Sequence, residues 1–160
     1  MVSLKKQSKG FTIIELMIVI IVIGVLGWLV VSTYGGIQSQ SRNAIRKSDI
    51  IAIQYKIEKF FQKNGYYPSF KNLNSTTWVN TNMDSLSEKT MIDPSSNSTT
   101  PTLVDSANGV AKEYAYYPTD SSGSSANCEA NDTTCAKYTL KATYEGVVNG
   151  QSYYSTQNLD

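Results

Sequence analysis

Residues 11–31 of this chain read FTIIELMIVIIVIGVLGWLVV, an almost unbroken apolar run that contains one carboxylate, Glu15. As an α-helix these 21 residues span roughly 31 Å, close to the thickness of the hydrocarbon core of a bilayer. No small-residue cleavage site of the A-x-A kind follows the run, so it differs from a secretory signal peptide. We therefore expect a retained helix that crosses a membrane once.

The orientation of this helix follows from the charges in front of it. Three lysines, Lys5, Lys6 and Lys9, precede the apolar run. Because basic residues stay preferentially on the cytoplasmic side, we expect the amino end in the cytoplasm and the bulk of the chain outside. The predicted location is a single-pass protein of the inner or cytoplasmic membrane.

Glu15 is the one costly residue in the apolar run. A charged side chain at the centre of a membrane helix costs about 2.5–3.5 kcal/mol, and less near an interface. Such residues are usually retained because another group pairs with them. The alternative is that Glu15 lies near the headgroups and is simply solvated.

The string KGFTIIELMIVI, residues 9–20, resembles the amino-terminal signature of type IV pilins and the related pseudopilins and competence pilins. The resemblance implies that residues 1–10 are a leader peptide, which a prepilin peptidase cuts off between Gly10 and Phe11. It also implies methylation of the new amino terminus at Phe11. Glu15 matches the family glutamate, which is thought to pair with the terminal amine of a neighbouring subunit during assembly. The implied partners are further copies of the same chain, the peptidase, and a pilus assembly platform with its ATPase.

Beyond Val31 the sequence predicts that the same helix continues as an amphipathic segment, so that the whole helix covers residues 11–64. Gly35 and Gly36 are its weak point, since each glycine costs about 1 kcal/mol relative to alanine in a helix. We expect either a bend or melting on assembly at this pair, or close packing against a neighbour.

An apolar stripe marks the face of this second segment that covers a small domain. Ile50, Ile53, Ile57 and Phe60 recur at spacings of three and four residues. Asn64–Gly65 is a good helix stop, because glycine tolerates the left-handed backbone that often ends a helix.

Residues 66–160 are predicted to form one globular head. Its first half is rich in Ser, Thr and Asn, and we expect loops at Asn74–Asn82 and Asp93–Asn108. We expect short elements between these loops, and Trp78 and Leu86 are candidate buried anchors.

Strand signals follow in the second half of the head. Glu113–Tyr117 is short and aromatic, and Lys137–Glu145 alternates between apolar and polar residues. Asn149–Gly150 suits a type I′ turn into Gln151–Thr156. The predicted class is α+β: a long helix, transmembrane in its first half, with a small antiparallel sheet of three or more strands packed on its carboxyl-terminal half.

The chain has two cysteines, Cys128 and Cys135, which flank a six-residue loop. In a segment outside the cytoplasm, a pair this close predicts a disulfide. Zinc is the rival interpretation, but the sequence has no histidine and no further cysteine to complete four ligands. We expect no metal and no cofactor.

Charge is divided unevenly along the chain. Residues 42–63 carry a net charge of +4, whereas residues 66–160 carry −5. A basic stem and an acidic head could attract one another between stacked subunits, or both could be ordinary solvated faces. The negative head argues against strong general binding of nucleic acid, so DNA remains a conceivable partner without direct support.

Catalysis has little support in this sequence. Without histidine, neither a Ser-His-Asp nor a Cys-His arrangement can be built, and no glycine-rich phosphate loop is present. We therefore expect no enzyme and no catalytic residue.

Three functions fit these observations. The first is a structural subunit of a type IV pilus, extracellular after assembly, which serves adhesion, twitching motility or DNA uptake. The second is a pseudopilin of a type II secretion system, and the third is an unprocessed, membrane-anchored surface protein.

Overall fold

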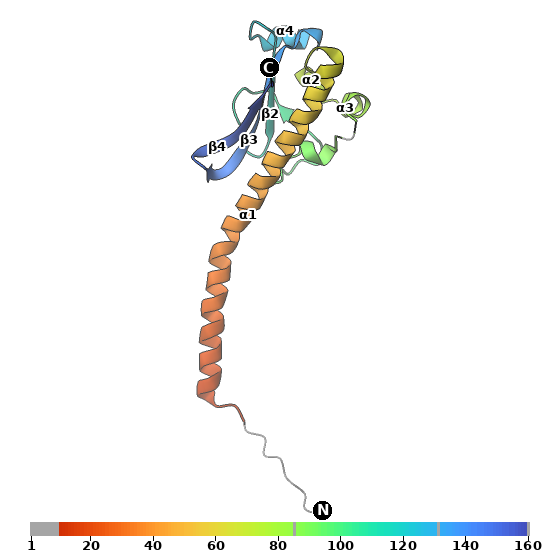
Figure 1. Ribbon diagram of the computed structural model, residues 1–160. Coiled ribbons are helices and arrows are strands. Elements are labelled where there is room, and N and C mark those ends of the chain that lie inside the picture. Colours follow the sequence, from red (N-terminus) through yellow and green to blue (C-terminus); the bar gives the residue numbers. More distant parts are fainter. Residues whose placement is uncertain (1–9, 85, 131, 160) are drawn as a thin grey trace, which may run out of the picture. The chain divides into compact units, whose positions relative to one another are not determined.

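The computed structural model describes residues 10–84, 86–130 and 132–159. The predicted leader therefore lies outside the described residues, except for Gly10. The chain divides into two compact units, Met1–Gln38 and Ser39–Asp160. Helix α1, Ile13–Asn64, belongs to both units and is helical throughout, including Gly35 and Gly36 (Figure 1).

Helix α1 begins two residues later than the sequence predicts. Phe11 and Thr12 lie outside it. Thr12 caps the first turn, because its Oγ1 accepts a hydrogen bond from the Glu15 N–H (3.3 Å) and its carbonyl accepts one from the Leu16 N–H. The helix ends at Asn64 as predicted, and Gly65 follows with a φ of +80°.

The second unit contains a four-stranded sheet in the order β1–β2–β3–β4. Its strands are β1 Leu103–Val104, β2 Tyr114–Thr119, β3 Lys137–Val148 and β4 Gln151–Gln157. Strands β2, β3 and β4 form the antiparallel meander that the alternation predicts, while the short β1 adds in parallel to β2 and makes the sheet mixed.

The β3–β4 turn has the predicted geometry. Asn149 and Gly150 both have positive φ, 52° and 79°, as a type I′ turn requires. Between Thr143 and Val148 the pairing of β3 with β4 shifts register, which marks a bulge in the ladder. This bulge positions the polar network described below.

The core of the second unit lies between α1 and the sheet. Ile50, Ile53 and Ile57 are completely buried, which confirms the predicted stripe, and Phe60 is 6% exposed. They pack in one cluster with alternate residues of β2 and β3, namely Tyr114, Tyr116, Tyr138, Leu140 and Ala142. The packing of α1 against this sheet makes the fold α+β, as the sequence predicts.

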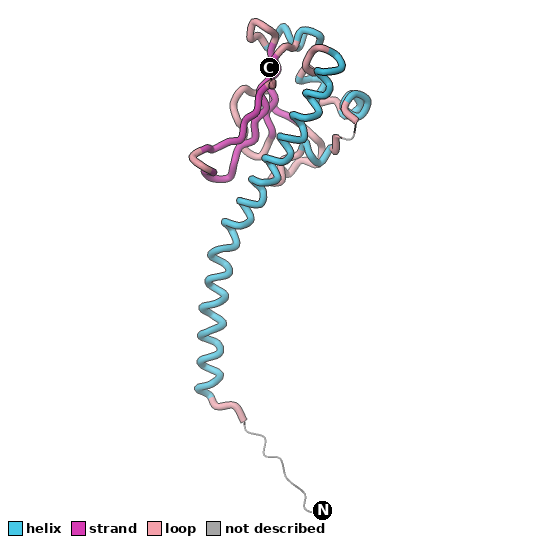
Figure 2. Tube along the Cα trace, viewed as in Figure 1, coloured by secondary structure: helices cyan, strands magenta, loops and turns pink. Residues whose placement is uncertain are grey.

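The expectation of a loop at Asn74–Asn82 is wrong. Residues Phe70–Leu73 form α2 and Thr76–Asn82 form α3, shown as helical turns in Figure 2. Ser75 caps α3 by accepting a hydrogen bond from the Trp78 N–H. The weak helix formers Thr and Asn are overridden because Val79 is buried and Trp78 packs on Phe60, with ring centroids 5.1 Å apart.

The remaining elements are short. They are the 3₁₀ turn η1 Glu88–Met91, the helix α4 Ser125–Ala130 and the 3₁₀ turn η2 Asp132–Thr134. A disulfide joins Cys128 to Cys135, whose Cα atoms lie 4.8 Å apart, and both cysteines are buried. Between them, the Glu129 carboxylate accepts hydrogen bonds from the Phe70 and Lys71 N–H groups at the start of α2.

Candidate functional site

The first unit offers one feature, an apolar helix surface that the rest of the described chain leaves uncovered. The large apolar side chains from Phe11 to Val31 are between 45% and 85% exposed. An 18-residue window of α1 reaches a mean hydropathy of 2.9, and none of it is buried. By length and composition this segment can cross a membrane, and it can equally be covered by other copies.

Glu15 lies in the first turn of α1, on this uncovered surface. Among the described residues, its carboxylate has no hydrogen-bond or ion-pair partner. Gly10 and Phe11 are exposed and precede the helix. The single chain thus keeps the bond between Gly10 and Phe11 accessible, and it does not bring Glu15 together with a cation among the described residues.

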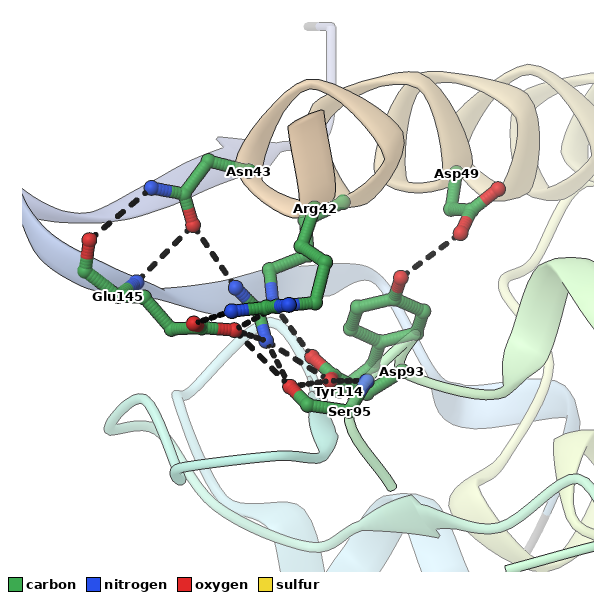
Figure 3. A network of polar contacts seen from close by, with 8 residues as sticks. Arg42, Asn43, Asp49, Asp93, Ser95, Tyr114 and Glu145 are labelled. Atoms are coloured by element: carbon green, nitrogen blue, oxygen red, sulfur yellow. Dashed lines mark hydrogen bonds and ion pairs between the residues drawn. The ribbon is translucent and has the colours of Figure 1, made fainter. Parts of the chain in front are cut away.

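The second unit contains a polar network where α1 meets β3 (Figure 3). At its centre Arg46 is completely buried and forms an ion pair with Asp93, whose side chain is also unexposed. Arg46 Nε donates to Asp93 Oδ2 at 2.6 Å, and Nη2 donates to Asp93 Oδ1 at 2.9 Å. Nη1 donates to the Asn43 side-chain oxygen at 2.8 Å, so every nitrogen of the guanidinium is used.

Glu145 joins this network from the bulge of β3. Its carboxylate accepts from Arg46 Nη2 at 2.9 Å and pairs with Arg42 through two hydrogen bonds. Its backbone is held by Asn43, whose Nδ2 donates to the Glu145 carbonyl (3.1 Å) and whose Oδ1 accepts from the Glu145 N–H (2.9 Å). The side-chain amide of Asn43 therefore takes the place of a strand partner at the bulge.

These contacts move the pKa of both carboxyl groups. The hydrogen bond from Arg42 is the main cause that lowers the pKa of Glu145 to about 2. Burial acts to raise the pKa of Asp93, but the hydrogen bonds from Arg46 and Ser95 outweigh it, so the pKa lies below its ordinary value. Both carboxylates are ionised at neutral pH, and the network is an ionic clamp with no free acid or base for catalysis.

A third carboxylate of the second unit, Glu58 on α1, is held by tyrosines. Glu58 accepts hydrogen bonds from the hydroxyl groups of Tyr67 (3.1 Å) and Tyr138 (2.6 Å). Burial, followed by the bond to Glu58, raises the pKa of Tyr138 above its ordinary value. Glu58 thus ties α1 to the segment after the helix and to β3.

The network changes the interpretation of the charge division. Arg46 is buried and Arg42 is partly exposed, and acids of the same chain neutralise the charge of both. Lys47 lies over the ring of Tyr154, 5.6 Å from its centroid. Attraction between a basic stem and an acidic head would therefore depend on the remaining lysines of α1.

Sequence reasoning missed the clamp, although a signal for it exists. Asn43 and Arg46 continue the spacing of Ile50 and Ile53 by steps of three and four residues towards the amino end. They therefore lie on the face of α1 that packs on the sheet. A polar and a charged residue on that buried face require partners, but spacing alone does not name Asp93 and Glu145.

Each comparison with known proteins matches less than half of the chain. Residues 5–31 match the family model described as the prokaryotic N-terminal methylation motif. The chain is 32% identical over 66 residues to the type II secretion system core protein G of Dickeya chrysanthemi, covering 41% of this chain and 43% of the relative. It is 35% identical over 65 residues to the protein of the same name from Pseudomonas aeruginosa, covering 41% and 46%.

A type IV pilin is also among the relatives. The type IV major pilin protein PilA of Myxococcus xanthus is 32% identical over 66 residues, covering 41% of this chain and 30% of the relative. The chain thus spans less than half of the length of these relatives. No solved structure matches it.

Proposed function

We propose that the chain is a filament subunit of the pilin and pseudopilin family, which assembles through α1 after its leader is removed, because it is similar to members of that family. The observation that carries this proposal is the uncovered apolar surface of α1 with one carboxylate, Glu15, on its first turn. In water, exposure of such a surface does not stabilise a monomer. A bilayer covers it before assembly, and identical helices cover it afterwards.

The proposed chemistry of assembly uses the new amino terminus. Cleavage between Gly10 and Phe11 creates an ammonium group, and methylation of Phe11 keeps its charge. The Glu15 carboxylate of one copy pairs with this ammonium group of another inside an apolar bundle. Removing one partner of a buried ion pair leaves an uncompensated charge, which typically costs about 3–5 kcal/mol. Glu15 therefore sets the register of the filament.

Of the two kinds of filament, the pseudopilus of a type II secretion system has the better support. Most of the related proteins that match are core protein G of that system. The chain would then be anchored in the inner membrane and would assemble below the cell surface. The machinery implied is a prepilin peptidase and an assembly platform with its ATPase.

The type IV pilus, the first expectation from the sequence, is the second candidate. The similarity to PilA and the Ser/Thr/Asn-rich surface of the head favour it. Cells that carry long surface filaments built from this chain, seen by electron microscopy after labelling of the head, would decide for the pilus. Loss of protein export on deletion, without surface filaments, would decide for the pseudopilus.

Processing and assembly are tested with the full chain coexpressed with a prepilin peptidase. We expect the mass to fall by residues 1–10 and to rise by one methyl group, with no change when the peptidase is omitted. Glu15→Ala should be processed but should fail to enter filaments. A surface-exposed chain that keeps its leader, or normal filaments from Glu15→Ala, would contradict the proposal.

A further inference from the structure

We propose that the tip of the β3–β4 hairpin docks into a groove on α1 of a second copy of this chain, an inference that rests on the filament function proposed above. The hairpin tip is residues 146–152. The groove is lined by side chains of α1 and by one residue near the carboxyl end: Ile51, Gln54, Tyr55, Glu58, Lys59, Gln62 and Leu159. Both features lie within the second unit.

The hairpin tip is held in one shape before it meets a partner. The Asn43 amide binds both backbone groups of Glu145, and Arg42 and Arg46 bind its carboxylate, directly before the tip begins. Gly146, Asn149 and Gly150 then adopt positive φ. A contact made by a segment that is already ordered loses less conformational entropy on binding.

The same tip is exposed and carries no charge. Val147 is 72% exposed, although it belongs to β3, which pairs with β4 on both sides of the register shift. From Gly146 to Leu159 the sequence contains no Lys, Arg, Asp or Glu. The tip therefore presents an apolar side chain and turn backbone, which suit an apolar recess.

The groove lies on a face of α1 that does not contribute to the core. Ile51 and Tyr55 are 47% and 65% exposed, whereas their neighbours Ile50 and Ile53 are completely buried. Leu159, 76% exposed, closes one side. The recess has a volume of about 410 Å³. Its one carboxylate, Glu58, is already bound by the hydroxyl groups of Tyr67 and Tyr138, so an uncharged tip does not leave that charge without partners.

The occupant is a second copy because the tip is tied to a different part of its own helix. It is anchored at Asn43, and at about 1.5 Å per residue Ile51 and Tyr55 lie roughly 12 and 18 Å further along α1. Tip and groove are different surfaces, so their contact leaves each pair with one unused tip and one unused groove. Contacts of this head-to-tail type continue into open polymers.

The test places the photocrosslinker p-benzoylphenylalanine at position 147 of the full chain, in cells that assemble it. Crosslinks between copies are recognised on a denaturing gel because their product has twice the mass of the chain. We expect position 147 to crosslink to the tryptic peptide 48–56 of another copy. The matched control is the same probe at Ser122, in another exposed turn, which should give about tenfold less of this product.

A second probe separates this inference from the proposed function. A crosslinker at Val22 reports contact between apolar segments of two copies. If Val22 crosslinks, three results at position 147 would overturn the docking and leave the filament in place. The probe could be silent, could reach peptide 48–56 only within its own copy, or could reach another protein. Silence from both probes would overturn both.

Substitutions complete the test. Val147→Asp should lower the assembled fraction about tenfold, and Asn43→Ala should weaken the crosslink from position 147 because the tip loses its anchor. Cys128–Cys135 oxidation and protease resistance of the head report that each variant is folded. Folded Val147→Asp that assembles as well as the parent chain would contradict the docking.

Discussion

Arg46 and Asp93 form an ion pair in which neither side chain reaches solvent, with Nε and Oδ2 2.6 Å apart. The two residues are 47 positions apart, one on α1 and the other after η1. Because Glu145 of β3 binds the same guanidinium, this pair fixes the helix, a loop and the sheet at one point. The hairpin tip starts at Gly146, directly after Glu145.

Asp93→Asn should destabilise the second unit by about 3–5 kcal/mol, because Arg46 keeps its charge in a buried position without its main partner. Urea unfolding of the full chain in detergent, followed by tyrosine fluorescence, measures the change. The control is Arg42→Ala, which breaks the partly exposed pair with Glu145 and should cost about 1 kcal/mol or less. Equal effects of the two substitutions would show that burial of Arg46 is unimportant.

Acid should weaken the clamp in a defined range. The pKa of Glu145 falls from 4.5 to about 2 on folding, and that of Asp93 also falls, so their stabilisation is complete above about pH 4.5 and is lost as the pH drops towards 2. Asp49 acts oppositely, since burial raises its pKa. The free energy of unfolding, measured from pH 7 to 2, should decline less steeply in Glu145→Gln than in Glu88→Gln. Equal slopes of the unfolding free energy against pH in the two variants would contradict a role for Glu145 in the acid response.

Removal of the disulfide should loosen the start of α2. Cys128→Ser combined with Cys135→Ser should cost roughly 2–3 kcal/mol by the chain-entropy estimate for so short a loop. Hydrogen exchange should also rise at the Phe70 N–H group, because Glu129, which accepts its hydrogen bond, lies between the cysteines. The control is Glu129→Ala with the disulfide intact. Unchanged exchange at Phe70 in both variants would exclude this link.

Two glycines, Gly35 within α1 and Gly65 directly after it, should respond to alanine in opposite directions. Gly65 has a φ of +80°, so Gly65→Ala should destabilise the second unit by about 1 kcal/mol. Gly35 is helical and nothing lies within 4 Å of an added Cβ, so Gly35→Ala should stabilise the monomer helix by up to about 1 kcal/mol. Circular dichroism and unfolding in detergent measure both. Destabilisation by Gly35→Ala would mean that the helix is already broken there.

The sequence predicts best where a signal is local and repeats. The apolar run from Phe11 to Val31, the stripe that starts at Ile50 and the turn at Asn149–Gly150 each depend on a few neighbouring residues. The loop expected at Asn74–Asn82 failed because Trp78 and Val79 gain more from the core than Thr and Asn lose in a helix.

By itself the sequence determined the apolar helix, its single carboxylate, the end of α1 at Asn64 and the α+β class, because spacing and hydrophobicity along the chain decide these. Only the tertiary structure decided which acids meet Arg46. Asp93 and Glu145 lie 47 and 99 residues from Arg46 in the sequence. The residues around a charged side chain do not indicate which distant residue will pair with it. The bulge of β3 and the fold of α1 onto the sheet bring them together, because a buried guanidinium is tolerated only where every donor finds an acceptor.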